Sequence, residues 1–73
     1  MNDKKLTQEW KDRGDDVETF PIVVVYKDKR TFPASWYYKT LNEAKADSRP
    51  IETITVRKYD ANGCEVARIL ESR

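Results

Sequence analysis

The sequence predicts an α+β fold: a small antiparallel sheet with one short helix on one face, in ββαββ order, preceded by a flexible N-terminal arm. Three observations predict it. Residues 20–26 are the most apolar run, residues 40–43 carry a helix-start pattern, and residues 60–63 form a turn between two alternating runs. With 73 residues, the chain is expected to form one domain with a small core.

Residues 1–18 are expected to form a charged arm, separate from a single domain over residues 19–73. The arm holds four Lys/Arg and six Asp/Glu, a net charge of −2, whereas the domain holds ten and seven, a net charge of +3. A short helix over residues 7–13 would place Leu6 and Trp10 on one face, but so short a helix is marginal in water. We therefore expect the arm to stay disordered or loosely docked until a partner binds it.

The run at residues 20–26 is β-branched rather than alternating, which predicts a central strand covered on both faces for much of its length. Pro21 fits only the start of such a strand. Residues 27–30 form a polar turn, after which residues 31–38 can return as a second strand. Because Pro33 interrupts regular pairing, this strand is expected at an edge or with a bulge.

Thr40 and Glu43 fit the capping box, in which the threonine hydroxyl accepts a hydrogen bond from the glutamate amide and the glutamate carboxylate accepts one from the threonine amide. The helix that follows is expected to be short, because Pro50 forbids much continuation. Leu41 and Ala44 would face the sheet.

Residues 53–59 and 64–70 alternate on either side of the turn and predict a β-hairpin. With a four-residue loop, Tyr59 pairs with Cys64 and Lys58 with Glu65. This register places an apolar stripe beneath the helix, formed by Ile54, Val56, Ala67 and Ile69. The other face has the mixed composition of a recognition surface and carries Arg57, Tyr59, Val66, Arg68 and Leu70. Alternatively, the aromatic cluster or Trp10 of the arm folds over Val66 and Leu70 and makes them a second small core.

Composition excludes several classes of function. The chain has no histidine, so neither a His-based metal site nor a Ser-His or Cys-His pair can be assembled, and Cys64 has no partner for a disulfide. The carboxylates fall in turns, at a cap or opposite a lysine, where structural roles account for them. The sequence therefore predicts no enzyme and no cofactor. No apolar run approaches a membrane span and no signal peptide is evident, which predicts a cytoplasmic protein.

A second candidate surface combines aromatic and basic residues. It comprises Phe32, Trp36, Tyr37 and Tyr38, interleaved with Lys27, Lys29, Arg30 and Lys39. Such residues could stack unpaired bases and contact phosphates. In the alternative interpretation, Phe32 and Trp36 fill the core, while Tyr37 is directed outward.

Residues 38–44, Tyr-Lys-Thr-Leu-Asn-Glu-Ala, and residues 54–57, Ile-Thr-Val-Arg, resemble the central part of small phage-encoded inhibitors of bacterial RNA polymerase. Length and the charged arm also resemble small transcription regulators of lytic Xanthomonas phages, which displace sigma factor and suppress termination. The chain departs from the coliphage inhibitors in ending with the hairpin at residues 60–63. The resemblance thus implies a partner rather than a set of contacts.

We therefore expect a non-enzymatic, monomeric protein-binding regulator that binds a bacterial RNA polymerase subunit and inhibits initiation, suppresses termination, or both. If the chain is phage-encoded, it would act in the host cytoplasm during host takeover. The alternative is a small module that binds single-stranded nucleic acid, RNA first. The candidate partner-binding residues are Trp10, Lys29, Arg30, Tyr37, Arg57, Tyr59, Val66, Arg68 and Leu70.

Overall fold

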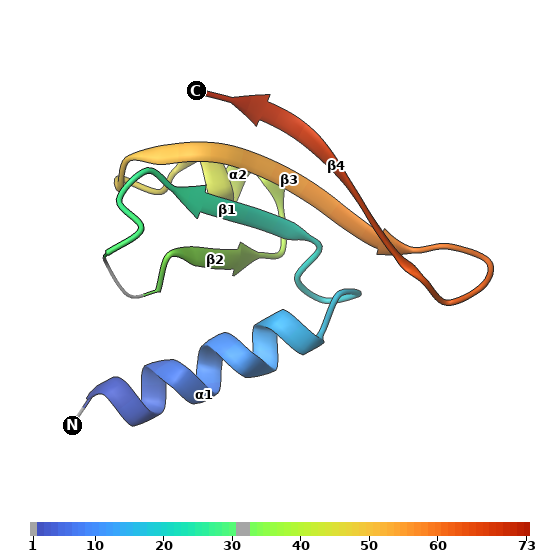
Figure 1. Ribbon diagram of the computed structural model, residues 1–73, viewed down its shortest axis with the longest axis horizontal. Helices are drawn as coiled ribbons and strands as arrows, with labels where there is room; N and C mark the ends of the chain where they lie inside the picture. Colours follow the sequence, from blue (N-terminus) through green and yellow to red (C-terminus); the bar gives the residue numbers. More distant parts are fainter. Residues whose placement is uncertain (1, 31–32) are drawn as a thin grey trace.

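The computed structural model describes residues 2–30 and 33–73, with side chains from residue 8 onward in those ranges. Its elements are α1 (Asn2–Asp15), β1 (Ile22–Tyr26), β2 (Ser35–Tyr38), α2 (Leu41–Lys45), β3 (Ile51–Tyr59) and β4 (Glu65–Ser72). The strands form one antiparallel sheet in the order β2-β1-β3-β4, with α2 behind it and α1 alongside β2 (Figure 1). The predicted α+β class is therefore confirmed.

The core lies on the side of the sheet that α2 covers, which we call the α2 face. Its buried residues are Ile22, Val24, Tyr26, Ala44, Ile51 and Ile54. As predicted, β1 is a central strand, but on its opposite face Val23 and Val25 are only half-buried. β2 is an edge strand that begins after Pro33, in agreement with the break expected there. Phe32 lies outside the described residues.

The start of α2 shows the N-cap half of the predicted capping box. Thr40 has extended backbone angles, and its hydroxyl accepts a hydrogen bond from the Glu43 amide at 3.2 Å. Ala44 is fully buried against the sheet and Leu41 packs beside the core. The helix is short, ending with the C-cap Ala46.

α1 runs from Asn2 to Asp15 and is longer than the helix expected over residues 7–13. The side chain of Leu6, and therefore its predicted pairing with Trp10, lies outside the described side chains. The C-terminal end of α1 contacts the sheet through Arg13 and Gly14. The flexibility of residues 1–18 remains a prediction.

The predicted hairpin is present, but its register is wrong by one residue. Tyr59 pairs with Glu65 and Lys58 with Val66, so the loop has five residues, 60–64, instead of four. The reason lies in the loop. The Asp60 carboxylate accepts hydrogen bonds from the amides of residues 62 and 64, both at 2.9 Å, and keeps Cys64 within the turn. Gly63 supplies the positive φ of 81° that this turn requires.

The shift reverses the two faces of β4, because side chains alternate along a strand. Ala67 now lies opposite Arg57 and Ile69 opposite Thr55, whereas Arg68 lies opposite Val56 on the α2 face. The expected stripe of Ile54, Val56, Ala67 and Ile69 beneath the helix is therefore wrong for its two β4 members. The pairing also shifts at a bulge between Ile54 and Thr55.

Candidate protein-binding edge

The two edges of the sheet differ in whether another element covers them. At the β2 edge, the Arg13 side chain of α1 donates a hydrogen bond to the outward carbonyl of Tyr37 at 2.9 Å. Its guanidinium also lies 4.7 Å from the ring centre of Phe20 and 4.9 Å from that of Trp36. A Cβ atom on Gly14 would lie 3.3 Å from the Tyr37 hydroxyl, so helix and strand are in close contact. This short edge is covered.

Arg57 holds the end of α1 in that position. Its guanidinium donates to the carbonyls of Arg13 and Gly14 at 2.8 Å each, and to that of Phe20 at 3.1 and 3.3 Å. It also lies 4.4 Å from the ring centre of Tyr37. A cation that satisfies the last carbonyls of a helix complements the helix dipole as well.

The expectation that Arg57 is exposed on a recognition surface is therefore wrong, since only 6% of it is accessible. Sequence reasoning missed the role because its acceptors come from residues about forty positions earlier in the chain. No sequence pattern around Arg57 indicates them.

The β4 edge is open. The Arg57 amide donates a hydrogen bond to the carbonyl of Pro21, just before β1, and the Asp60 amide donates one to the carbonyl of Cys64. The backbone N–H and C=O groups of even-numbered residues of β3 therefore face β4. By the same alternation, the backbone groups of residues 65, 67 and 69 point away from the sheet. In the described ranges, no element lies beyond them (Figure 1).

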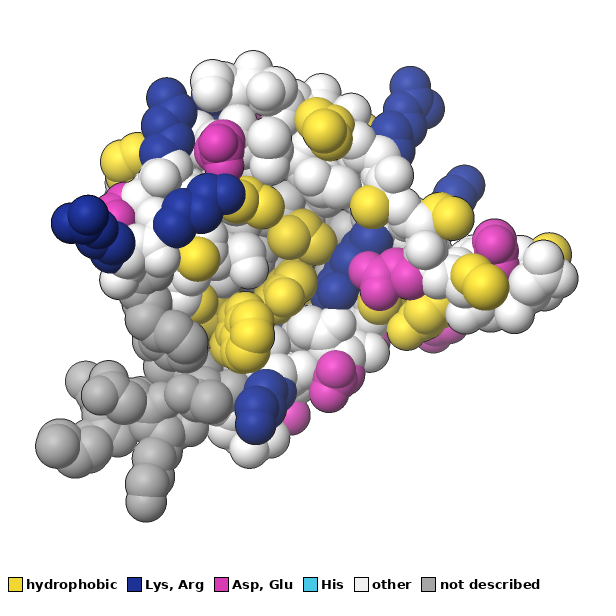
Figure 2. Space-filling view, in the orientation of Figure 1, with side chains coloured by type: hydrophobic (Ala, Val, Ile, Leu, Met, Phe, Trp, Pro, Cys, Tyr) yellow, Lys and Arg dark blue, Asp and Glu magenta, His cyan; other side chains and the backbone are white. Residues whose placement is uncertain are grey.

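Apolar side chains surround this edge. Among the side chains that the structure describes, the exposed large hydrophobic residues all lie on the hairpin: Tyr59, Val66, Ile69 and Leu70. Ile69 is the most exposed of them at 62%. On the α2 face, a groove of about 280 Å³ is lined by Val56, Lys58, Val66, Ala67 and Arg68. The projecting hairpin forms the narrow end of the molecule in Figure 2.

The structure thus divides the predicted recognition surface. Val66 and Arg68 lie on the α2 face beside the groove, whereas Tyr59 lies on the opposite face beside Glu65. Leu70 is exposed near the bulge. The alternative in which Trp10 covers Val66 is not observed, because Trp10 lies next to Tyr37 and Gly14 instead.

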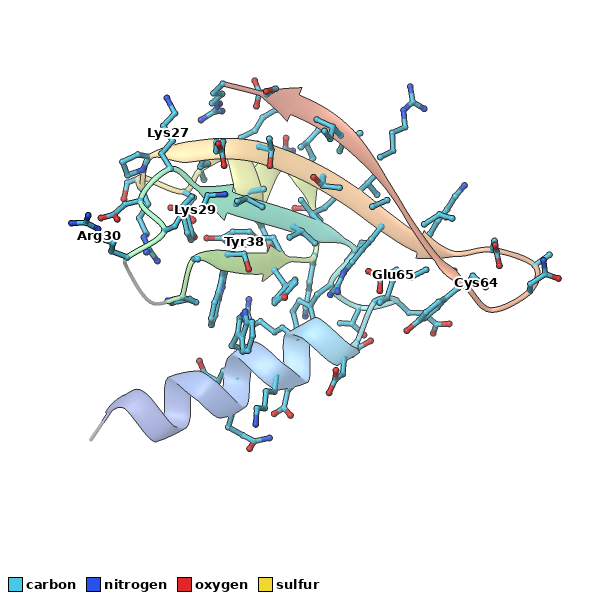
Figure 3. All side chains as sticks on the ribbon, viewed as in Figure 1. Lys27, Lys29, Arg30, Tyr38, Cys64 and Glu65 are labelled. Carbon is cyan, nitrogen blue, oxygen red and sulfur yellow. The ribbon has the colours of Figure 1, made fainter. Side chains whose placement is uncertain are left out.

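The aromatic and basic candidates do not form one free surface. Tyr37 lies against α1 and Arg57, and Lys29 forms an ion pair with Glu52 at 3.0 Å. Arg30 is exposed in the β1–β2 loop, near Lys27 and Lys29, at the end of the sheet away from the hairpin loop (Figure 3). Of the predicted stacking residues, Trp36 packs against the core.

A polar cluster behind the sheet was not anticipated. The hydroxyls of Tyr26 and Tyr38 both donate to one carboxylate oxygen of Asp47, at 2.5 and 2.6 Å. Asp47 also accepts a hydrogen bond from the Arg49 amide at 2.8 Å. Burial by itself raises the pKa of the Asp47 carboxyl. The three hydrogen bonds lower it by more, so the pKa of Asp47 lies below its ordinary value. Burial, and then the bond to Asp47, raise the pKa of Tyr38 to about 12.

This cluster ties the segment after α2 to the sheet. Arg49 lies 3.9 Å from the ring centre of Tyr26 and donates to the carbonyl of Pro33 at 3.3 Å. The polar groups of the cluster are thus engaged with one another, and we assign it a structural role. Among the residues described, no group of three or more Cys, Asp or Glu side chains is placed to hold a metal ion.

Comparison of the chain with protein-family models, curated proteins and solved structures found no match. No helix in the described part of the chain is long and apolar enough to cross a membrane.

Proposed function

We propose that this protein is a non-enzymatic protein-binding module that presents the free edge of β4 to an extended segment of its partner. The observation that carries the proposal is the contrast between the edges. The β2 edge is four residues long and covered by α1, whereas β4 is eight residues long and open. Exposed strand edges bind extended segments through main-chain hydrogen bonds.

The side chains of β4 support this interpretation. Soluble proteins commonly protect long edge strands, because an open edge invites pairing with other chains. Here Val66, Ile69 and Leu70 are left exposed beside the open backbone. Burial of such residues contributes favourably to binding at about 25 cal/mol per Å² of apolar surface. The hairpin is therefore a better candidate interface than the covered β2 edge.

The proposed partner is a subunit of bacterial RNA polymerase. This choice rests on the resemblance of residues 38–44 and 54–57 to small phage inhibitors of that enzyme. The open edge of β4 supports a protein partner in general. The bound module would act as a regulator by competing with sigma factor for its contact on the polymerase, or by reshaping that contact.

The experiment compares Ala67→Pro with Ala67→Val. The Ala67 amide points outward, so proline removes a donor for the partner without removing a hydrogen bond of the β3–β4 ladder. Valine keeps that amide and serves as the matched control. Biolayer interferometry on purified RNA polymerase core, from Escherichia and from Xanthomonas, should give at least about tenfold weaker binding for proline, equivalent to about 1.4 kcal/mol, and near wild-type binding for valine.

Two results would contradict the proposal. If neither polymerase binds the wild-type chain, the proposed partner is wrong. If both Ala67 variants bind as tightly as wild type, the β4 edge is not the interface. Binding to single-stranded RNA would instead weaken steeply with salt and would not depend on the amide of residue 67.

A further inference from the structure

The α2 face of the hairpin carries two exposed cations next to the open edge. Lys58 of β3 lies opposite Val66, and Arg68 of β4 lies opposite Val56, so the two cations are diagonal neighbours on one face. Among the described residues, neither has an ion-pair partner. Their apolar neighbours Val56 and Val66 line the groove between them.

The glutamates of β4 do not compensate these charges. Glu65 lies on the opposite face and is 3.8 Å from the guanidinium of Arg57. Glu71 forms an ion pair with Arg73 at 3.1 Å. The groove therefore combines apolar walls with uncompensated positive charge, and an acidic partner would complement it.

We propose that the segment docking on β4 is an extended strand of the partner in which acidic side chains alternate with aliphatic ones. This inference rests on the proposed function, because it assumes that the open edge accepts a strand. It goes further by specifying the sequence pattern that the edge would select.

The pattern follows from the backbone geometry. An added strand would pair with the outward backbone groups of residues 65, 67 and 69, and its side chains would alternate between the two faces. Side chains opposite Val66 and Arg68 would lie on the α2 face, where Asp or Glu meets Arg68 and Lys58. Side chains opposite Ala67 and Ile69 would lie on the other face, where aliphatic groups cover Ile69.

A second copy of this chain fits the same edge poorly. Two β4 strands that pair antiparallel are related by a two-fold axis perpendicular to the sheet. The α2 faces of both copies would therefore lie on the same side of the joined sheet. Lys58 and Arg68 of each copy would then gather on that side. Such a concentration of like charge disfavours the dimer and favours an acidic segment.

The test uses short capped peptides about as long as β4, alternating valine with glutamate, and the matched peptide that alternates valine with lysine. Binding is followed by changes in the amide NMR signals of the full-length protein. We expect shifts at the amides of residues 65, 67 and 69, with affinity for the glutamate peptide at least about fivefold higher than for the lysine peptide, since cross-strand charge pairs are modest. Ala67→Pro should abolish these shifts.

Charge reversal provides the specific control. Arg68→Glu should weaken binding of the glutamate peptide about tenfold and strengthen binding of the lysine peptide. Lys27→Glu makes the same change in net charge at the other end of the sheet and should alter neither affinity much (Figure 3). Both positions are exposed, so both variants are expected to fold.

Each outcome is decisive for the acidic pattern. Equal affinity for the two peptides, with Ala67→Pro still abolishing binding, would overturn the charge preference while leaving the edge as a strand-binding site. Shifts that Ala67→Pro leaves unchanged, or no shifts with either peptide, would overturn the inference itself. A concentration-dependent dimer in sedimentation, abolished by Ala67→Pro, would identify a second copy as the occupant instead.

Discussion

Replacement of Arg57 by leucine is predicted to destabilise the protein by about 3 kcal/mol. The guanidinium donates four hydrogen bonds to the carbonyls of Arg13, Gly14 and Phe20, of which the two to α1 are 2.8 Å long. Hydrogen bonds from charged groups contribute about 1.5–3 kcal/mol each. We count the two short bonds at the lower value, because water can partly rehydrate carbonyls at a helix end. Leucine keeps most of the apolar volume, so the loss reports on the polar contacts.

The assay is urea denaturation at pH 7, followed by far-ultraviolet circular dichroism. A loss of about 3 kcal/mol would be a large fraction of the stability of so small a domain. Arg57→Lys should fall between wild type and leucine, because one ammonium cannot reproduce the forked contacts of a guanidinium. Hydrogen exchange should show that residues 8–15 of α1 lose protection before the sheet does.

Arg68→Leu is the matched control, since Arg68 lies on the neighbouring strand with its side chain exposed. It should change the free energy of unfolding by no more than about 0.5 kcal/mol. If Arg57→Leu is equally mild, the guanidinium does not anchor α1, and the cover over the β2 edge must have another cause.

Four further predictions concern the polar cluster, the hairpin loop and the arm. Because the pKa of Asp47 is lowered in the folded state, its contribution to stability is present above the unfolded value of about 3.9 and is lost as pH falls through the folded pKa. Asp47→Asn should therefore flatten the acid limb of stability measured by urea titration between pH 7 and pH 2. The pKa of Tyr38 is raised to about 12, so its contribution to stability is present below pH 10 and is lost as pH rises from about 10 to about 12. Tyr38→Phe should reduce this loss of stability at alkaline pH, with tyrosinate absorbance as the readout. Gly63→Ala should cost about 1 kcal/mol, although nothing lies within 4 Å of the added Cβ, because φ is +81°; an unchanged urea midpoint would contradict this. Residues 4–11, which precede the anchored end of α1, should show lower heteronuclear NOE values than the sheet, and uniformly high values would refute the predicted flexibility.

Local interactions determined several features directly. The N-cap hydrogen bond from the Glu43 amide to the Thr40 hydroxyl forms because donor and acceptor are three residues apart, so no distant contact is needed. The turn that contains Gly63 is also determined locally, since only glycine adopts its positive φ readily. The apolar run that forms β1 predicted a central strand for a similarly simple reason: such residues need cover from neighbouring strands.

The tertiary structure decided which side chains can meet a partner. One hydrogen bond, from the Cys64 amide to the Asp60 carboxylate, favours a loop of five residues over one of four, and this single step reverses the faces of β4. The role of Arg57 could not be predicted from the sequence either, because its acceptors at Arg13 and Gly14 become its neighbours only after folding. Sequence patterns report periodicity and nearest neighbours along the chain, whereas register and long-range hydrogen bonds depend on small differences in free energy between alternative packings.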